Sequence, residues 1–233
     1  MSLSPSGVVI EQNSVMNKEI NNKTLRILIL WMLIFGAVEV FFLNVITMDN
    51  YLIAIPYFLT IILMVVTFNK TIFRIVTRET KTDKYLLLII PLILHGLIYW
   101  VCVKYLREPT ELIRNNSVSF LSLNKFYLWV KPLHVLLQQM MIIVLVKKLH
   151  QNNVSLREIM VFTAILFGAT HIYPFLVGSM TLPIASYFTG FAVAGSIIFP
   201  HQILMVKNGY LNNIIMHTMF YSLSALLFWS LYG

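Results

Sequence analysis

The chain contains few charged residues and almost nothing that forms covalent cross-links. Of its 233 residues 11% are charged and 58% are hydrophobic. This balance excludes an ordinary soluble domain and is typical of a polytopic membrane protein. The single cysteine, Cys102, excludes an internal disulfide and does not resemble part of a metal site. The sequence also lacks a glycine-rich phosphate loop, a cysteine cluster and an internal repeat, so no cofactor is expected.

The few charges that are present are mostly positive. The formal net charge is +8, which in a soluble protein would indicate a nucleic-acid partner. In a membrane protein the same excess is explained by basic cytoplasmic loops and by contact with anionic lipid. The sequence therefore predicts a membrane-embedded protein without a nucleic-acid partner.

Seven stretches are apolar enough to cross a bilayer, which takes about 20 residues of helix. They are 26–46, 51–69, 85–105, 129–149, 158–177, 182–200 and 211–232. The sixth is the weakest, because Gly190, Gly195 and Pro200 interrupt it, and its small residues favour close helix packing. Residues 1–24 are polar and lack the features of a cleavable signal. We therefore expect a flexible tail followed by one all-α transmembrane domain over 25–233.

The distribution of basic residues predicts the orientation of this domain. With the N-terminus inside, twelve of the 17 Lys and Arg residues fall in cytoplasmic segments. The positive-inside rule then places the N-terminus inside and the C-terminus outside. The long outer connection, about 106–128, is expected either to lie on the membrane surface as an amphipathic helix or to be an ordinary loop.

Two histidines lie inside the expected spans, His171 in the fifth and His217 in the seventh. An ionisable group in hydrocarbon is costly and is a candidate functional residue by default. The fourth span adds two adjacent amides, Gln138 and Gln139. Neither histidine has a carboxylate beside it in the sequence, which limits the chemistry that such a site can perform.

Several of these polar residues are four apart and therefore share a helix face. The pairs are His134 with Gln138, Phe167 with His171, and Asn213 with His217. Each polar group needs a partner in hydrocarbon, and facing one another across the bundle is the least costly arrangement. The pattern favours one shared site; hydrogen bonds that merely join helices are the alternative.

Two further possibilities concern the titratable residues. Glu39 lies midway along the first span, where it is expected to be protonated, paired with a histidine, or part of the site. His134, His171 and His217 are in principle a three-histidine set for zinc. The sequence has no His-Glu-x-x-His motif, so no metal is expected.

The segment of about 130–233 resembles the CPBP or Abi family, named for CAAX proteases and bacteriocin-processing enzymes. Members share a Glu-Glu-x-x-x-Arg motif, a Phe-x-x-x-His motif and a late His-x-x-x-Asn motif. Phe167 and His171 match the second motif, and the stretch from Gly195 to His217 resembles the family's last two helices. The resemblance implies a CPBP-type helical core in the C-terminal half.

The chain departs from the family motifs at four positions. Gln138 and Gln139 stand in place of the two glutamates, Ile143 in place of the arginine, and Tyr221 in place of the asparagine. In proteolytic members a glutamate is thought to activate water, while the histidines and the asparagine orient water and stabilise an oxyanion. A glutamine amide does not accept a proton at neutral pH and cannot be a general base. Proteolysis by the family mechanism is therefore not expected.

One branch of the family, in low-GC Gram-positive bacteria, works with a papain-like membrane-associated partner to N-acylate lipoproteins. The resemblance implies phospholipid and lipoprotein substrates, and a location in the bacterial cytoplasmic membrane. A neutral imidazole suits acylation of an amine better than a carboxylate does, so His171 is the expected base. The residues expected to donate to an oxyanion or to orient the lipid ester are His217, Asn213 and Gln138. The expected supporting residues are His134, Gln139, Phe167, Tyr221 and Glu39.

Two other functions remain open from the sequence. The first is an intramembrane protease in which His134 or Glu39 replaces the missing glutamate. The second is a non-catalytic partner that uses the same fold to hold a lipid, a peptide or an enzyme subunit.

Overall fold

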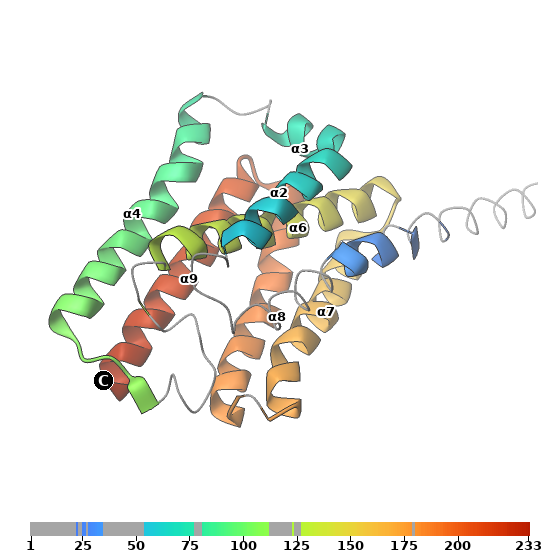
Figure 1. Ribbon diagram of the computed structural model, residues 1–233. Helices are drawn as coiled ribbons and strands as arrows, with labels where there is room; N and C mark the ends of the chain where they lie inside the picture. Colours follow the sequence, from blue (N-terminus) through green and yellow to red (C-terminus); the bar gives the residue numbers. More distant parts are fainter. Residues whose placement is uncertain are drawn as a thin grey trace, which may run out of the picture.

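The computed structural model describes residues 22, 25–26, 28–34, 54–76, 81–111, 123, 127–178 and 180–233. All regular structure in this part of the chain is helical (Figure 1). A helix satisfies its own backbone hydrogen bonds, as a bilayer requires. The predicted all-α class is therefore confirmed. The expected tail, Glu39 and most of the 106–128 connection lie outside the described residues.

The helices with defined bounds begin at residue 54. They are α2 (Ala54–Thr67), α3 (Asn69–Val76), α4 (Lys81–Tyr105), α6 (Tyr127–Gln151), α7 (Leu156–Leu176), α8 (Leu182–Met205) and α9 (Gly209–Tyr232). A further helical segment covers residues 28–34. Four of these helices, α6 to α9, are long and apolar enough to cross a membrane. The C-terminal half of the chain thus has the helices of a membrane protein.

The three N-terminal spans stay predictions. Helix α2 has 14 residues and a length of about 21 Å, less than the roughly 30 Å of a bilayer core. In α4 the apolar part is Leu92–Tyr105, which is also short. Of the expected span 26–46, the structure describes residue 26 and residues 28–34. The fourth to seventh spans correspond to α6–α9.

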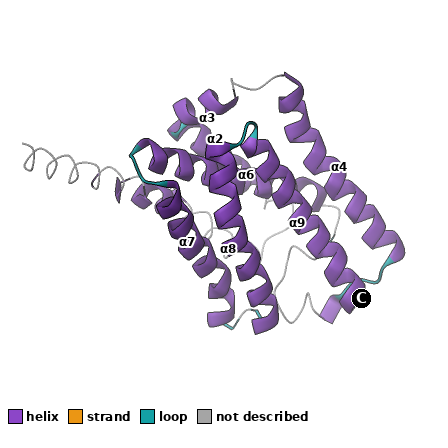
Figure 2. Ribbon diagram, turned by 180° about the vertical axis from the view of Figure 1, so that it is seen from behind, coloured by secondary structure: helices purple, strands orange, loops and turns teal. Residues whose placement is uncertain are grey.

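Helix α6 is the centre of the bundle. It contacts α2, α3, α4, α7, α8 and α9, and it runs across α8 and α9 (Figures 1 and 2). Its residues 141–146 are all buried, in agreement with the rule that a helix apolar all round is an interior helix. Around it, α7 pairs with α8 and α4 pairs with α9. Of the polar residues on α6, Lys131 and Gln139 are buried inside the protein.

Helix α8 continues through Pro200 to Met205, beyond the end expected from the sequence. Proline lacks the N–H that would bond the carbonyl four residues earlier, that of Ser196. The hydroxyl of Thr163 on α7 lies 3.0 Å from this carbonyl and 2.8 Å from the Ile159 carbonyl of its own helix, and its single proton is shared between them. The Ser196 hydroxyl likewise lies 2.6 Å from the Ala192 carbonyl and 3.1 Å from the Thr163 carbonyl. The neighbouring helix thus brings a polar group to the carbonyl that proline leaves unpaired, as in other transmembrane helices that contain proline.

The turn from α8 to α9 depends on Gly209. A Cβ atom there would lie 1.8 Å from the carbonyl oxygen of Gln202, so Gly209→Ala must open the turn. We expect a loss of about 1–3 kcal/mol in the free energy of unfolding, the usual range for overpacking. Thermal unfolding of the purified protein in one non-ionic detergent measures it.

The matched control is Gly190→Ala in the middle of α8. Nothing lies within 4 Å of a Cβ atom at Gly190, and alanine is the better helix former by about 0.5–1 kcal/mol. This variant should be as stable as the parent protein or more so. Equal unfolding temperatures for the two variants would contradict the tight packing of Gly209 against Gln202.

Candidate functional site

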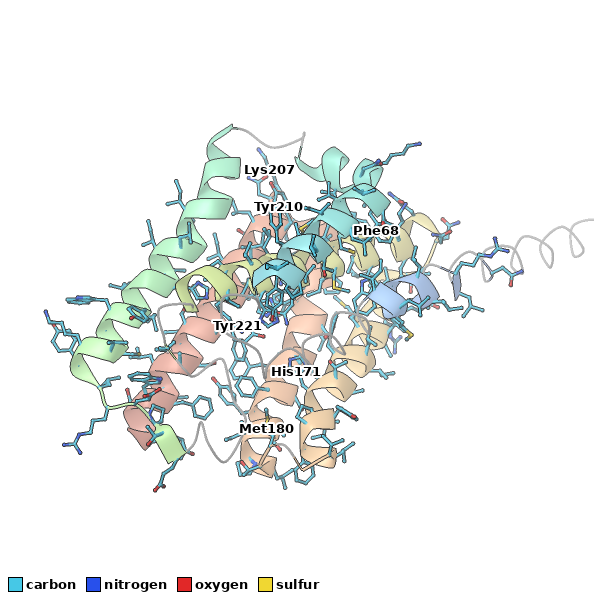
Figure 3. The ribbon with its side chains drawn as sticks, in the orientation of Figure 1. Phe68, His171, Met180, Lys207, Tyr210 and Tyr221 are labelled. Carbon is cyan, nitrogen blue, oxygen red and sulfur yellow. The ribbon has the colours of Figure 1, made fainter. Side chains whose placement is uncertain are left out.

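Polar side chains from α6 and α9 contact one another in the middle of the bundle, and His171 on α7 is near enough to interact with them electrostatically. Figure 3 shows Tyr221 and His171 between Lys207, near one end of the bundle, and Met180, at the other. Tyr221 lies halfway along the 24 residues of α9. The site is therefore near the midpoint of a membrane-length helix.

Two glutamines of α6 contact the residues of α9. The Gln139 amide nitrogen lies 2.6 Å from His217 Nδ1, and the Tyr221 hydroxyl donates to Gln138 Oε1 at 3.4 Å. The rings of His217 and Tyr221, four residues apart, stack with centroids 5.1 Å apart and planes at 17°. The sequence analysis expected Gln138 to act directly and Gln139 to support it, but the contact with a histidine is made by Gln139.

The contact with Gln139 determines where His217 carries its proton. An amide nitrogen only donates, so Nδ1 accepts and the neutral ring carries its proton on Nε2. His217 therefore presents an Nε2–H donor. Gln139 is fully buried, and its Oε1 atom has no hydrogen-bond partner among the described residues. A buried, unsatisfied amide oxygen is a place where a ligand or water can donate.

His171 has the opposite tautomer. Its Nδ1 lies 2.7 Å from the carbonyl oxygen of Phe167, one turn earlier in α7. A carbonyl only accepts, so Nδ1 carries the proton and Nε2 holds a free lone pair. The Thr170 hydroxyl also donates to this carbonyl, at 2.9 Å. The contact with its own helix thus leaves the Nε2 atom of His171 able to accept a proton.

Lys131 is the residue of this site that the sequence analysis missed. It is one of the five basic residues that the orientation count left to the outer segments, but its side chain is only 5% exposed. Its Nζ lies 3.0 Å from His134 Nδ1 and 3.4 Å from the centroid of the Tyr221 ring. An ammonium group donates, so His134 accepts at Nδ1 and carries its proton on Nε2. One signal was present: residues 131, 134 and 138 follow the i, i+3, i+7 spacing of one helix face.

The removal of Lys131 from the loops also affects the orientation argument. A buried lysine does not count toward the charge of an outer connection. The outer segments then hold four basic residues in place of five. The orientation with the N-terminus inside stays a prediction from the sequence.

Two expected site residues make contacts that join helices, and a third, Glu39, is not described. Asn213 is fully buried, and its amide donates to the Phe199 carbonyl at 3.2 Å, which joins α9 to α8. The Phe167 ring packs edge-on against Trp31 with centroids 6.0 Å apart. Phe167 therefore contributes its carbonyl to His171 and its ring to the packing of residues 28–34. Glu39 lies outside the described residues.

The polar groups also form one electrostatic unit. The charge of Lys131 interacts with the imidazoles of His134, His171 and His217. His171 interacts with the other two imidazoles in the same way. In the part of the chain that the structure describes, no group of three or more His, Cys, Asp or Glu side chains is arranged to hold a metal ion.

No protein family model, curated protein or solved structure matches this chain. The class of protein is therefore defined by the fold and the site themselves. It is a helical membrane protein with a cluster of imidazoles, amides and one ammonium group inside its bundle.

Proposed function

We propose that this chain is a membrane acyltransferase, or one subunit of such an enzyme, with a CPBP-type core. It moves an acyl chain from a phospholipid ester to the N-terminal amine of a lipoprotein. The observation that carries the proposal is the tautomer of His171, whose Nδ1–H is held by the Phe167 carbonyl at 2.7 Å. A neutral imidazole with a free Nε2 is the usual proton acceptor for attack by an amine.

The reaction balances without a cofactor. The amine nitrogen attacks the ester carbonyl carbon, and His171 Nε2 takes the proton that the nitrogen loses. The carbonyl oxygen becomes an oxyanion, which the Nε2–H donors of His217 and His134 stabilise. The C–O bond then breaks, and the proton on His171 passes to the oxygen of the departing lysophospholipid. An amide bond has formed and no group is oxidised or reduced.

The amides at 138 and 139 favour transfer over hydrolysis. Hydrolysis in the related proteases is thought to use a glutamate to activate water, and both positions are glutamine here. Gln139 instead fixes His217 as a donor through the 2.6 Å contact. An amine nucleophile needs less activation than water, so a single histidine base is sufficient for the first step.

The proposal extends to location and partners. The enzyme belongs in the cytoplasmic membrane of a bacterium with its N-terminus inside, and it works beside a papain-like partner protein. The proposed site lies near the midpoint of α9, and in this proposal both substrates enter it with their acyl chains in the bilayer.

The test is a comparison of lipoprotein N-termini by mass spectrometry in the host with and without this gene. Loss of the gene should leave a free amine, and the parent gene should restore the N-acyl group. His171→Ala and His217→Ala should fail to restore it while the protein accumulates in the membrane. Full N-acylation without the gene would refute the proposal. Restoration by a variant that carries both His171→Ala and His217→Ala would show that the chain is a non-catalytic partner. Cleavage of a prenylated or leader peptide by the purified protein would show that it is a peptidase.

A further inference from the structure

Lys131 is a cation held deep inside the bundle. It is only 5% exposed, and it is the second residue of the apolar span Val130–Gln151. A lysine at the end of a span ordinarily extends toward the membrane surface, which keeps its charge in water. Its carbon stem is long enough for that position. Instead the side chain turns into the protein.

The direction of the side chain is given by its contacts. Nζ lies 3.4 Å from the centroid of the Tyr221 ring, and Tyr221 is halfway along the 24 residues of α9. The ammonium group is therefore carried about 18 Å from either end of that helix. A charge at such depth is costly, and intramembrane charges mark substrate or ion sites by default.

The surroundings hold this ammonium group in one position. His134 Nδ1 accepts from Nζ at 3.0 Å, and the face of Tyr221 adds a cation–π contact. The same amine is near enough to interact electrostatically with His171, the proposed base, and with His217, a proposed oxyanion donor. Low dielectric disfavours the charged form of a buried lysine, and an anion bound beside Nζ restores it, so the charge of this site and the binding of an anion are coupled.

We propose that Lys131 forms an anion-binding subsite that takes the phosphodiester group of a phospholipid. The inference rests on the proposed acyl transfer only in naming a lipid as the source of the phosphate. Lysine is a common phosphate ligand, and a charge-assisted bond to phosphate is about twice as strong as a neutral one. With the headgroup phosphate on Lys131, the ester carbonyls of the same lipid lie a few bonds away, beside the histidines.

Binding of short-chain lipids tests this subsite directly. The purified full chain in a non-ionic detergent is titrated with dihexanoyl phosphatidylglycerol, with dihexanoylglycerol and with inorganic phosphate, and tryptophan fluorescence reports binding. The parent protein should bind phosphatidylglycerol more tightly than dihexanoylglycerol by about 10-fold or more, the effect of one hydrogen bond to a charged group. Equal affinity for the two lipids overturns the proposal, and this comparison needs no variant.

Variants then assign the effect to the residue. Lys131→Met keeps the length of the side chain and should remove the preference for phosphatidylglycerol, whereas Lys131→Arg should keep it. Lys207→Met, at an exposed lysine near one end of the bundle, is the matched control and should bind like the parent protein. An unchanged preference in Lys131→Met overturns the subsite.

A competition experiment distinguishes a lipid phosphate from free inorganic phosphate as the ligand of this subsite. Displacement of phosphatidylglycerol by an equal concentration of inorganic phosphate assigns the subsite to free phosphate and overturns the lipid source. No displacement supports the lipid. Binding is measured without acyl transfer, so a failure of the proposed enzyme activity leaves this result unchanged.

Discussion

His171→Asn is expected to lower the rate of acyl transfer by about 10²–10⁴-fold, the usual contribution of a general base. The asparagine amide nitrogen takes the place of Nδ1 and can still donate to the Phe167 carbonyl, now 2.7 Å from Nδ1. What disappears is Nε2 and its lone pair. The variant therefore separates the loss of the base from the loss of the helix contact.

The measurement is the initial rate of N-acylation of a lipopeptide by the purified enzyme, with its partner protein where one is required. His201→Ala is the control, because His201 is an exposed histidine on α8 outside the polar cluster. It should keep the parent rate. A rate for His171→Asn within threefold of the parent protein would exclude His171 as the base.

Gln139→Glu is expected to reverse the tautomer of His217. The glutamine amide donates to Nδ1 at 2.6 Å, whereas a carboxylate only accepts. The His217 proton must then move from Nε2 to Nδ1, and the Nε2–H donor is lost. Removal of one oxyanion donor costs about 10²–10³-fold in rate, so acyl transfer should fall by that factor.

Nitrogen-15 spectra of the histidine rings show the tautomer, and the lipopeptide assay shows the rate. Gln151→Glu is the control, because Gln151 is the exposed last residue of α6 and lies outside the polar cluster. Its rate should change little. A parent-like rate in Gln139→Glu, with the tautomer reversed, would remove His217 from the proposed chemistry.

The four C-terminal membrane-length helices, and the polar residues that they carry, could be predicted from the sequence because both depend on local composition. Apolar length predicted α6 to α9 within a few residues, except where α8 continues through Pro200 to Met205. That extension depends on the Thr163 hydroxyl of another helix. A contact between helices cannot be derived from the residues near a proline.

The pairing of side chains followed from the sequence only in part. The four-residue spacing placed His217 on a polar face, and the structure shows Gln139 as its neighbour at 2.6 Å. Sequence spacing did not distinguish Gln139 from Gln138, because both are on α6 and the choice depends on how α6 crosses α9. Asn213 was expected beside the histidines, and the structure shows that its amide donates to the Phe199 carbonyl of α8.

The sequence by itself determined that this is a helical membrane protein with histidines and amides inside its C-terminal spans. Hydrophobicity and residue type are properties of each segment, so no tertiary contact was needed. Only the tertiary structure decided the state of the site: the opposite tautomers of His171 and His217, and the burial of Lys131. A tautomer depends on the atom that faces each ring nitrogen, and burial depends on which helices surround a residue. Both are set by packing between distant segments.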